Sequence, residues 1–269
     1  MIPTHWNRPT DFPIAEGKRR IRIDVSYDGS LFSGWQRQHN VRTVQHEIEK
    51  ALYKILKEEI TVFGSGRTDA GVHALGQVAH FDTANHSVPI EAFALALNQL
   101  LDHDIRITKS SLVDDSFHAR FTSLKREYRY YTKEIKGYTP FDRNRVCRIR
   151  CFPSLKLLNS YAKYIEGIHD FTTFSSAADQ SRSRIRDVFI SRFFFEDSFN
   201  GSKVLVYQVA ANAFLMHQVR SMVGTMLQLG EKGAPKEEFK RRLDAKNRFE
   251  AGRTATSDGL YLYRIDYDS

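Results

Sequence analysis

The sequence predicts an α+β fold of two related ferredoxin-like, or RRM-like, domains whose antiparallel sheets form a central cleft. Hydrophobic periods typical of strands and helices alternate over residues 20–109 in the order β-α-β-β-α-β, which is the ferredoxin-like arrangement. Residues 125–267 repeat this theme with one additional strand in front. We therefore expect a flexible arm over residues 1–17, an N-terminal domain over 18–116 and a C-terminal domain over 117–269, with the cleft as a ligand site.

Four strands and two helices account for the first half. Residues 20–27 alternate as a half-buried strand does, and further strands are expected at 60–63, 77–82 and 105–109. Thr43 is a residue type that caps helices, and an apolar stripe of helical period follows it. Pro89 opens the second helix. The expected buried positions of this second helix are Ile90, Phe93, Ala94, Leu97, Leu100 and Leu101.

The second half shows the same two periods. Strands are expected at residues 125–133, 146–150, 185–195 and 204–211, and a helix is expected over 155–165. A long helix follows, and its apolar stripe is formed by Met216, Val219, Met222, Val223, Met226 and Leu227. Tyr261, Tyr263, Ile265 and Tyr267 alternate along the last strand.

Composition describes an ordinary globular protein, with 41% hydrophobic and 27% charged residues in a chain of 269. No apolar run approaches the length of a membrane span, and the polar N-terminus lacks the core of a signal peptide, so a cytoplasmic protein is expected. Cys147 and Cys151 are the only cysteines. No second pair completes a zinc site, and we interpret them as reduced packing residues.

The net charge of +8 predicts attraction to polyanions. Between residues 125 and 150 there are nine basic residues against three acidic ones, interleaved with tyrosines. Such a stretch offers phosphate contacts and rings for base stacking, although a solvated strand face would also explain it. A second basic cluster favours nucleic acid, and it consists of Arg182, Arg184 and Arg186.

The most informative segment is GSGRTDAGVHA, residues 64–74, which surrounds Arg67 and Asp69 with glycines between two strand-like runs. Glycines permit a tightly shaped loop at which a ligand can approach a carboxylate and an arginine. A plain hairpin turn with a capping aspartate is the alternative. The segment lacks the third glycine of a dinucleotide-binding loop and the Lys-Ser/Thr pair of a P-loop.

At these residues the chain resembles the TruA-type tRNA pseudouridine synthases. The resemblance runs from about residue 21 to the C-terminus. It rests on the segment above together with YDGSLFSGWQRQ (27–38), KREYRYY (125–131), GIHDFTTF (167–174), NAFLMHQVRSMVG (212–224) and DGLYL (258–262). Residues 175–188 depart from the pattern of the family.

The resemblance implies conversion of uridine to pseudouridine at positions 38, 39 and 40 of the tRNA anticodon arm, without cofactor or metal. It assigns the catalytic carboxylate to Asp69. Whether Asp69 attacks C1′, adds to C6 or deprotonates C2′ stays open. Arg67 is implied to help extract the base, and Tyr128 to stack on it and relay the C5 proton. Leu260 is implied to form an apolar wall of the pocket.

Arg220 lies on the otherwise apolar helix, where a buried guanidinium needs an anion, and pairing with Asp69 would keep that carboxylate ionised. We expect Arg143, Arg145 and Arg148 to contact RNA phosphates. The family also implies a homodimer, for which Phe193, Phe194 and Phe195 are candidate interface residues.

Two other classes of protein compete with this interpretation. A non-catalytic RNA-binding protein with RRM-like domains would carry the RNP1 aromatic pattern, which no segment fits. A metal-dependent nuclease would need a cluster of carboxylates, and none is visible. The histidines at 73, 80, 86 and 103 match no recognised spacing of metal ligands.

Overall fold

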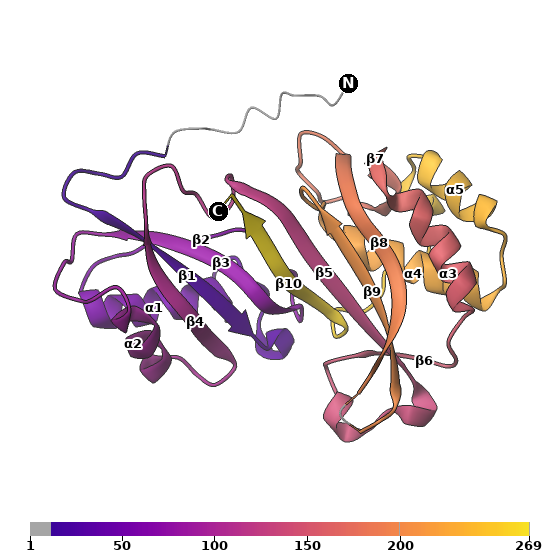
Figure 1. Ribbon diagram of the computed structural model, residues 1–269, viewed down its shortest axis with the longest axis horizontal. Coiled ribbons are helices and arrows are strands. Elements are labelled where there is room, and N and C mark those ends of the chain that lie inside the picture. The colour runs from indigo at the N-terminus through magenta and orange to yellow at the C-terminus, as the bar shows by residue number, and fades with distance from the viewer. Residues whose placement is uncertain (1–11, 199, 269) are drawn as a thin grey trace. The chain divides into compact units, whose positions relative to one another are not determined.

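The computed structural model describes residues 12–198 and 200–268 (Figure 1). The chain divides into two compact units, of which unit 1 runs to Leu124 and resumes at Arg264, and unit 2 comprises Lys125–Tyr263. Helices and largely antiparallel strands make up the described chain, which confirms the predicted α+β class. Residues 1–11 of the arm predicted over 1–17 lie outside the described residues.

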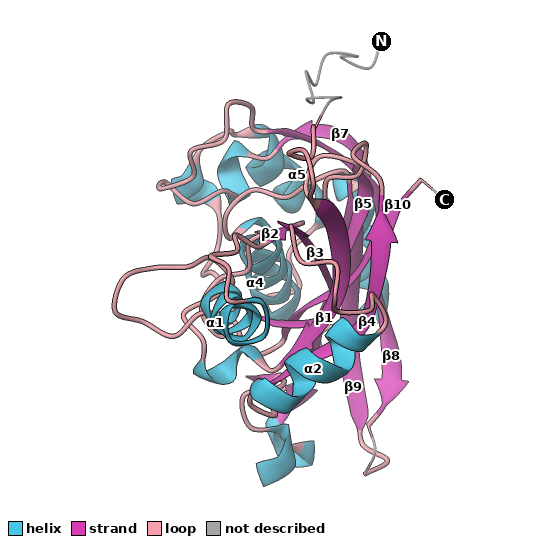
Figure 2. Ribbon diagram, turned by 90° about the vertical axis from the view of Figure 1, so that its left-hand side faces the viewer, coloured by secondary structure: helices cyan, strands magenta, loops and turns pink. Residues whose placement is uncertain are grey.

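Unit 1 has the ferredoxin-like order predicted from the sequence. Its elements are β1 (Arg19–Tyr27), α1 (Val44–Leu56), β2 (Phe63–Gly64), β3 (His73–Thr83), α2 (Ala92–Leu100) and β4 (Ile105–Val113). The strands lie in the order β4-β1-β3 with β2 paired to β3, and these pairs are antiparallel. The two helices contact each other on one face of this sheet (Figure 2). Ile21, Ile23 and Val25 of β1 are fully buried, as their alternation predicts.

Two details of unit 1 differ from the prediction. The predicted strand at 60–63 is wrong in extent, because only Phe63 and Gly64 pair with β3, although Ile60 and Val62 are buried. Helix α2 begins at Ala92 rather than at Pro89, because turns hydrogen-bonded to the carbonyls of residues 89 and 90 precede it. Leu100, predicted to be buried, is 41% exposed near the end of this helix.

Unit 2 contains more elements than the sequence predicts. They are β5 (Ser123–Glu134, which begins in unit 1), β6 (Cys147–Ile149), α3 (Leu155–Ala162), β7 (Gly167–Asp170), β8 (Ile185–Asp197), β9 (Lys203–Ala211), α4 (Gln218–Glu231), α5 (Lys236–Asp244) and the first half of β10 (Leu260–Tyr267). The strands β5-β9-β8-β7 form an antiparallel array, and β6 joins β5 in parallel. Neither β7 nor α5 was predicted.

In the part of β10 that belongs to unit 2, Leu260 and Leu262 are buried, and Tyr261 and Tyr263 lie on the less buried face. Burial corrects three predictions for this unit. Phe193 is 3% exposed and belongs to the core, which removes it from the candidate interface surface. Met216 is exposed and precedes the first helical residue of α4. Cys151 is exposed, so it is not a packing residue.

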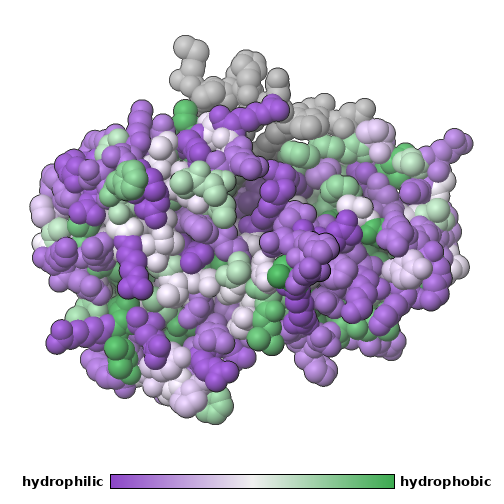
Figure 3. Space-filling view, turned by 180° about the vertical axis from the view of Figure 1, so that it is seen from behind, coloured by the Kyte–Doolittle hydropathy of each residue, from purple (hydrophilic) through white to green (hydrophobic). Residues whose placement is uncertain are grey.

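The face shown in Figure 3 is largely polar, with scattered apolar side chains. Within this part of the chain, no helix is long and apolar enough to cross a membrane. Isolated exposed apolar residues are normal on a globular surface, where polar atoms cannot cover everything.

Candidate active site

The loop that carries Asp69 joins β2 to β3 and is held by a buried amide. Gln77 is fully buried, and its Nε2 donates to the carbonyl of Gly66 at 2.8 Å while its Oε1 accepts from the Gly66 amide at 3.4 Å. The Ser65 amide continues the strand pairing with a 2.8 Å bond to the Val78 carbonyl. The loop therefore enters its bend in a fixed conformation.

The segment of residues 28–35 packs against the far side of this loop. The Trp35 amide donates to the Thr68 carbonyl at 3.2 Å, and the Gly71 amide donates to the Phe32 carbonyl at 3.2 Å. Gly34 has a φ of +94°, and a Cβ there would lie 2.5 Å from the Thr68 oxygen. A Cβ on Gly29 would lie 2.0 Å from the carbonyl oxygen of Val72. Glycine at both positions lets the two backbones touch.

Side chains complete this packing. The buried hydroxyls of Tyr27 and Thr68 share a hydrogen bond of 2.8 Å, one residue before Asp69. The Gly29 amide donates to Nδ1 of His73 at 3.0 Å, which gives this buried histidine a structural role. The two sequence segments that carry the strongest resemblance thus form one folded object within unit 1.

Asp69 is half-buried at the bend, and its carbonyl accepts a 3.1 Å bond from the Val72 amide. The loop does connect two paired strands, as the hairpin alternative requires. Most of the bonds described above, however, immobilise the backbone on both sides of Asp69. A scaffold that fixes the backbone on both sides of a carboxylate in this way is typical of a catalytic site.

Arg67 is exposed and is oriented by a chain of amides. Its Nε donates to Oε1 of Gln36 at 3.1 Å, and Nε2 of Gln36 donates to Oε1 of Gln45 at 3.0 Å. Gln45 in turn donates to Glu49 at 2.8 Å, and both residues are buried in α1. Helix α1 therefore positions the guanidinium that lies two residues from Asp69.

Tyr128 lies on β5 opposite Val209 of β9 and is 7% exposed. The ring of Phe214 meets it edge-on at a centroid distance of 5.1 Å and an interplanar angle of 86°. This contact holds the phenol ring in one orientation, as edge-to-face aromatic pairs do.

Arg220 is only half-buried on α4, whereas the sequence predicted a buried side chain. Its Nε donates to the Ala255 carbonyl at 2.9 Å, and the Ala255 amide donates to the Arg220 carbonyl at 3.1 Å. Gly224 lies one turn later, where a Cβ would be 1.9 Å from the Arg253 carbonyl oxygen. Residues 253–255 therefore lie directly against α4 and fix the guanidinium. Leu260, at the start of β10, is 5% exposed and suits the apolar wall predicted for it.

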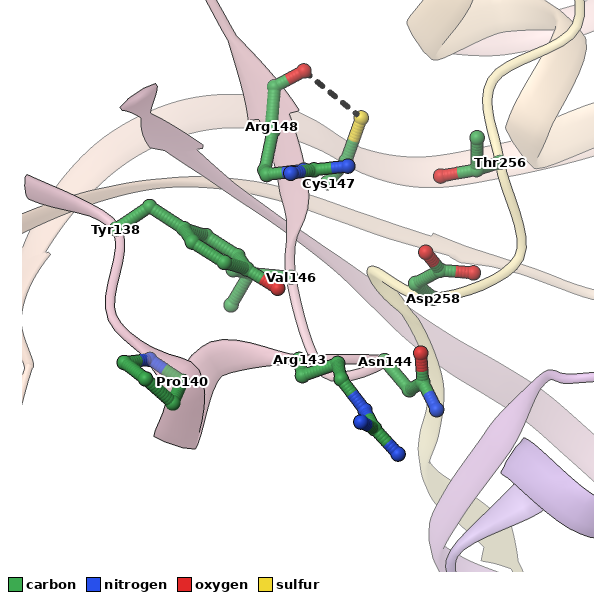
Figure 4. Close-up of a pocket in the computed structure, with 9 residues that line it drawn as sticks. All are labelled: Tyr138, Pro140, Arg143, Asn144, Val146, Cys147, Arg148, Thr256 and Asp258. Atoms are coloured by element: carbon green, nitrogen blue, oxygen red, sulfur yellow. Dashed lines mark hydrogen bonds between the residues drawn. The ribbon is translucent and has the colours of Figure 1, made fainter. Parts of the chain in front are cut away.

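The three predicted phosphate-binding arginines are exposed on the segment between β5 and the end of β6. Arg143 and Arg148 line a pocket of about 400 Å³ in unit 2 (Figure 4). Arg145 does not line it, and its carbonyl accepts a 3.0 Å bond from the hydroxyl of Tyr261.

Residues 175–188, which depart from the sequence pattern of the family, form a hydrogen-bonded structure around Asp179. This carboxylate accepts bonds from the amides of Met216 at 2.5 Å and Ser181 at 2.7 Å, and Arg184 pairs with it at 3.2 Å. Burial alone would raise the pKa of Asp179, but the bonds from the two amides and the charge of Arg184 outweigh it and lower the pKa. The second basic cluster is thereby anchored beside the residues that lead into α4.

Across the described residues, no group of three or more histidine, cysteine or acidic side chains is arranged to hold a metal ion. His80 instead packs within unit 1 against Phe63 and His118, at centroid distances of 5.2 Å and 4.6 Å. Burial, followed by the charges of His118 and Arg20, lowers the pKa of His80 to about 3.

A comparison with protein families decides the identity of this scaffold. The family model for tRNA pseudouridine synthase matches residues 24–122 and 161–268, which include the Asp69 loop, the whole of α4 and Leu260, whereas Tyr128 lies between the two matched ranges. The chain belongs to the tRNA pseudouridine synthase family. Pseudouridine synthases are isomerases, so the chain is an enzyme of that class.

Relatives within this family span nearly the whole chain. A protein named tRNA pseudouridine synthase A from Treponema denticola is 42% identical over 94% of this chain and 95% of its own length. Proteins of the same name from Bacillus pumilus and Bacillus subtilis are 41% and 40% identical over 93% of this chain and all of their own.

Some residues of this tRNA pseudouridine synthase position other site residues, and no motif of their own marks them in the sequence. Gln36 and Gln45 are polar residues of unremarkable spacing, and only the fold brings them to Arg67. Gln77 looks like an ordinary polar strand residue, although it is fully buried against the Asp69 loop. The one available signal was their position inside or beside the motif-bearing segments.

Proposed function

We propose that this protein converts uridine to pseudouridine in the anticodon arm of tRNA, at positions 38, 39 and 40, with Asp69 as the catalytic carboxylate. The observation that carries the proposal is the immobilised loop of Asp69 in a member of this family. Hydrogen bonds from Gln77, Trp35 and Gly71 hold the backbone around that carboxylate. The relatives described above are named tRNA pseudouridine synthase A, which supports tRNA as the substrate.

The reaction breaks the N1–C1′ bond of uridine and forms a C5–C1′ bond. C5 loses a proton, N1 gains one, and the composition of the nucleoside does not change. Such a rearrangement transfers no electrons and no external group, so the side chains themselves carry the acid, base and nucleophile roles. The target base must leave its stack to be reached, as in other enzymes that act on a nucleobase.

Each further site residue has a role in this proposal. Arg67 helps to extract the base, for which its position two residues from Asp69 is suited. Tyr128 stacks on the uracil and relays the C5 proton, and its ring is already oriented by Phe214. Arg220 keeps Asp69 ionised, and Leu260 provides apolar surface for the base.

Neighbouring target positions call for recognition of RNA by shape and backbone. The exposed guanidiniums of Arg143, Arg145 and Arg148 suit that recognition because phosphate contacts carry no direct sequence information. We further propose a cytoplasmic homodimer, with exposed Phe195 as one interface residue. Light scattering at micromolar protein should give twice the mass of the chain, and a monomeric mass would contradict the dimer.

One experiment separates this function from RNA binding alone and from nuclease activity. Purified protein is incubated with unmodified tRNA in EDTA, and pseudouridine is mapped by position. The wild type should form it at 38–40, Asp69→Asn should form none, and both should bind tRNA within about a few-fold of each other. Asp197→Asn, which alters an exposed carboxylate paired with Lys203, is the control and should keep full activity. Binding without product in the wild type would favour the RRM-like alternative.

A further inference from the structure

The pocket of unit 2 in Figure 4 is formed by two segments of the chain. Nine residues line its volume of about 400 Å³: Tyr138, Pro140, Arg143, Asn144, Val146, Cys147, Arg148, Thr256 and Asp258. That volume lies in the range of sites for small organic ligands. The ring of Tyr138 and the carboxylate of Asp258 lie on opposite sides of the hollow (Figure 4).

The first wall is fixed by a buried ion pair. Nζ of Lys133 lies 2.8 Å from Oδ2 of Asp142, and the two side chains are 1% and 6% exposed. The same oxygen accepts from the amide of Thr139 at 2.7 Å and from its hydroxyl at 2.9 Å. Tyr138 and Arg143 flank the residues held by these bonds. An aromatic ring on so well-held a segment is preorganised for stacking.

The second wall is fixed to β5. The hydroxyl of Tyr130 donates to the Thr256 carbonyl at 2.9 Å, and the Tyr131 amide donates to the Gly259 carbonyl at 2.8 Å. A Cβ on Gly259 would lie 2.4 Å from the Tyr131 carbonyl oxygen, so this backbone is in direct contact with β5. Asp258 is therefore held between two anchored residues.

Two of the three charged groups of the pocket have no hydrogen-bond or ion-pair partner among the residues that the structure describes. The carboxylate of Asp258 and the guanidinium of Arg143 make no hydrogen bond and no ion pair there. Arg148 contacts the ring of Tyr138, with its guanidinium carbon 5.0 Å from the centroid. Opposite charges that line one hollow without pairing are suited to a ligand that has both donors and acceptors.

We propose that this pocket binds one unpaired guanine of the RNA substrate, which is distinct from the uridine that reacts. The proposal rests on the proposed function for the identity of the polymer. Guanine presents adjacent N1–H and N2–H donors to a carboxylate, and it presents O6 and N7 acceptors to a guanidinium. The Tyr138 ring and the Arg148 guanidinium provide planar surfaces for stacking.

Other ligands fit this pocket less well. Uracil has a single N–H between two carbonyls, so the oxygens of its edge would be repelled by the Asp258 carboxylate. A bare phosphate inside the hollow would be repelled by Asp258, so the phosphate contacts proposed above for Arg143 and Arg148 are those of the RNA backbone outside the hollow. The carboxylate thus turns a cationic surface into one that discriminates among bases.

The test uses equilibrium dialysis of the whole protein against each of the four nucleoside 5′-monophosphates. GMP should bind at least about fivefold more tightly than UMP, in line with the value of one stacked and hydrogen-bonded base. Tyr138→Ala and Asp258→Asn should each weaken GMP binding by about fivefold or more. Tyr138→Phe retains the ring and should bind GMP as the wild type does, and Asp197→Asn should also leave binding unchanged.

Two results would overturn the inference: GMP binding no tighter than UMP binding, or equal GMP affinities for wild type, Tyr138→Ala and Asp258→Asn. Thermal unfolding confirms that each variant is folded, and Tyr138→Phe distinguishes loss of stacking from loss of structure. Formation of pseudouridine by the wild type is measured in parallel. A protein that forms pseudouridine but shows no guanine preference refutes the pocket alone, whereas guanine binding without pseudouridine refutes the proposed function alone.

Discussion

The guanidinium of Arg67 donates through Nε to the side-chain oxygen of Gln36 at 3.1 Å. Gln36 belongs to the N-terminal motif, and Arg67 belongs to the loop of the proposed catalytic carboxylate. The bond continues through Gln45 to Glu49, so the arginine is oriented from the buried side of α1.

Gln36→Ala should lower turnover several-fold while tRNA affinity stays within about twofold, because the guanidinium remains present but loses its orientation. Single-turnover rates and filter-binding affinities, compared with those of Gln38→Ala, check this. Gln38 also has an exposed amide, but it bonds to the Ser33 carbonyl instead. Equal rates for the two variants would remove Gln36 from the positioning of Arg67.

Gly34→Ala should destabilise the Asp69 loop more than a left-handed backbone alone explains. Gly17 is the matched control, because it has a φ of +76° with open space around it, whereas a Cβ on Gly34 would lie 2.5 Å from the Thr68 oxygen. Left-handed backbone costs an alanine about 1–2 kcal/mol. We expect that loss for Gly17→Ala in denaturant titrations, and a larger loss with little activity for Gly34→Ala. Similar losses at both positions would contradict the packing described here.

Tyr128→Phe should bind tRNA as the wild type does but release the C5 proton more slowly, since the ring stacks and the hydroxyl relays. RNA with tritium at C5 of uridine measures that release directly. Tyr53→Phe, which alters an exposed tyrosine of α1, should release tritium at the wild-type rate. If Tyr128→Phe does the same, the hydroxyl has no part in the reaction.

Replacing Arg143, Arg145 and Arg148 by alanine should weaken binding to every tRNA without changing which uridine reacts. Each phosphate contact that is lost should lower the slope of log K against log salt by about one unit. A control triple variant of Lys163, Lys240 and Arg241 removes three exposed cations that already pair with Glu166, Asp244 and Glu238. The slope of this control should change less than that of the arginine variant. If the arginine variant instead modifies other positions while its slope stays unchanged, recognition through the RNA backbone is refuted.

The stability of the protein should fall as the pH drops from about 6.5 toward 3, because buried His80 is neutral when folded. Burial first and nearby charges second lower its pKa from the ordinary value of about 6.5 to about 3, so the unfolded chain binds the extra proton in that window. The slope is at most about 1.4 kcal/mol per pH unit for one such group. His80→Gln should flatten the dependence in urea titrations, whereas exposed His46→Gln should not.

Period and motif in the sequence predict much of the fold. Alternation at Ile21, Ile23 and Val25 identifies β1, and the glycine-rich segment identifies the loop of Asp69. Helix α5 was not predicted because its sequence is largely charged and buries only Phe239 and Leu243. Strand β7 was not predicted because its four residues are too few to show the alternation typical of a strand.

The site was predictable only in its motif residues. Asp69 and Arg67 are adjacent in sequence to the glycines that shape their loop, so their setting can be inferred locally. The pairings of Gln36 with Arg67 and of Lys133 with Asp142 depend on tertiary contacts that no local pattern encodes. The roles of Tyr128, Arg220 and Leu260, and the domain boundaries at residues 17 and 116, stay predictions.

The backbone contact between residues 29–35 and the Asp69 loop makes these two segments interchangeable only as a pair. Gly29 lies against Val72, Gly34 against Thr68, and Gly64 against the ring of Trp35. The surfaces of the two segments are therefore complementary in shape. If one of these segments were replaced alone by that of a distant relative, it would no longer be complementary to its neighbour at these three contacts. Engineers who wish to alter this site by recombination should therefore exchange residues 27–38 and 64–74 together.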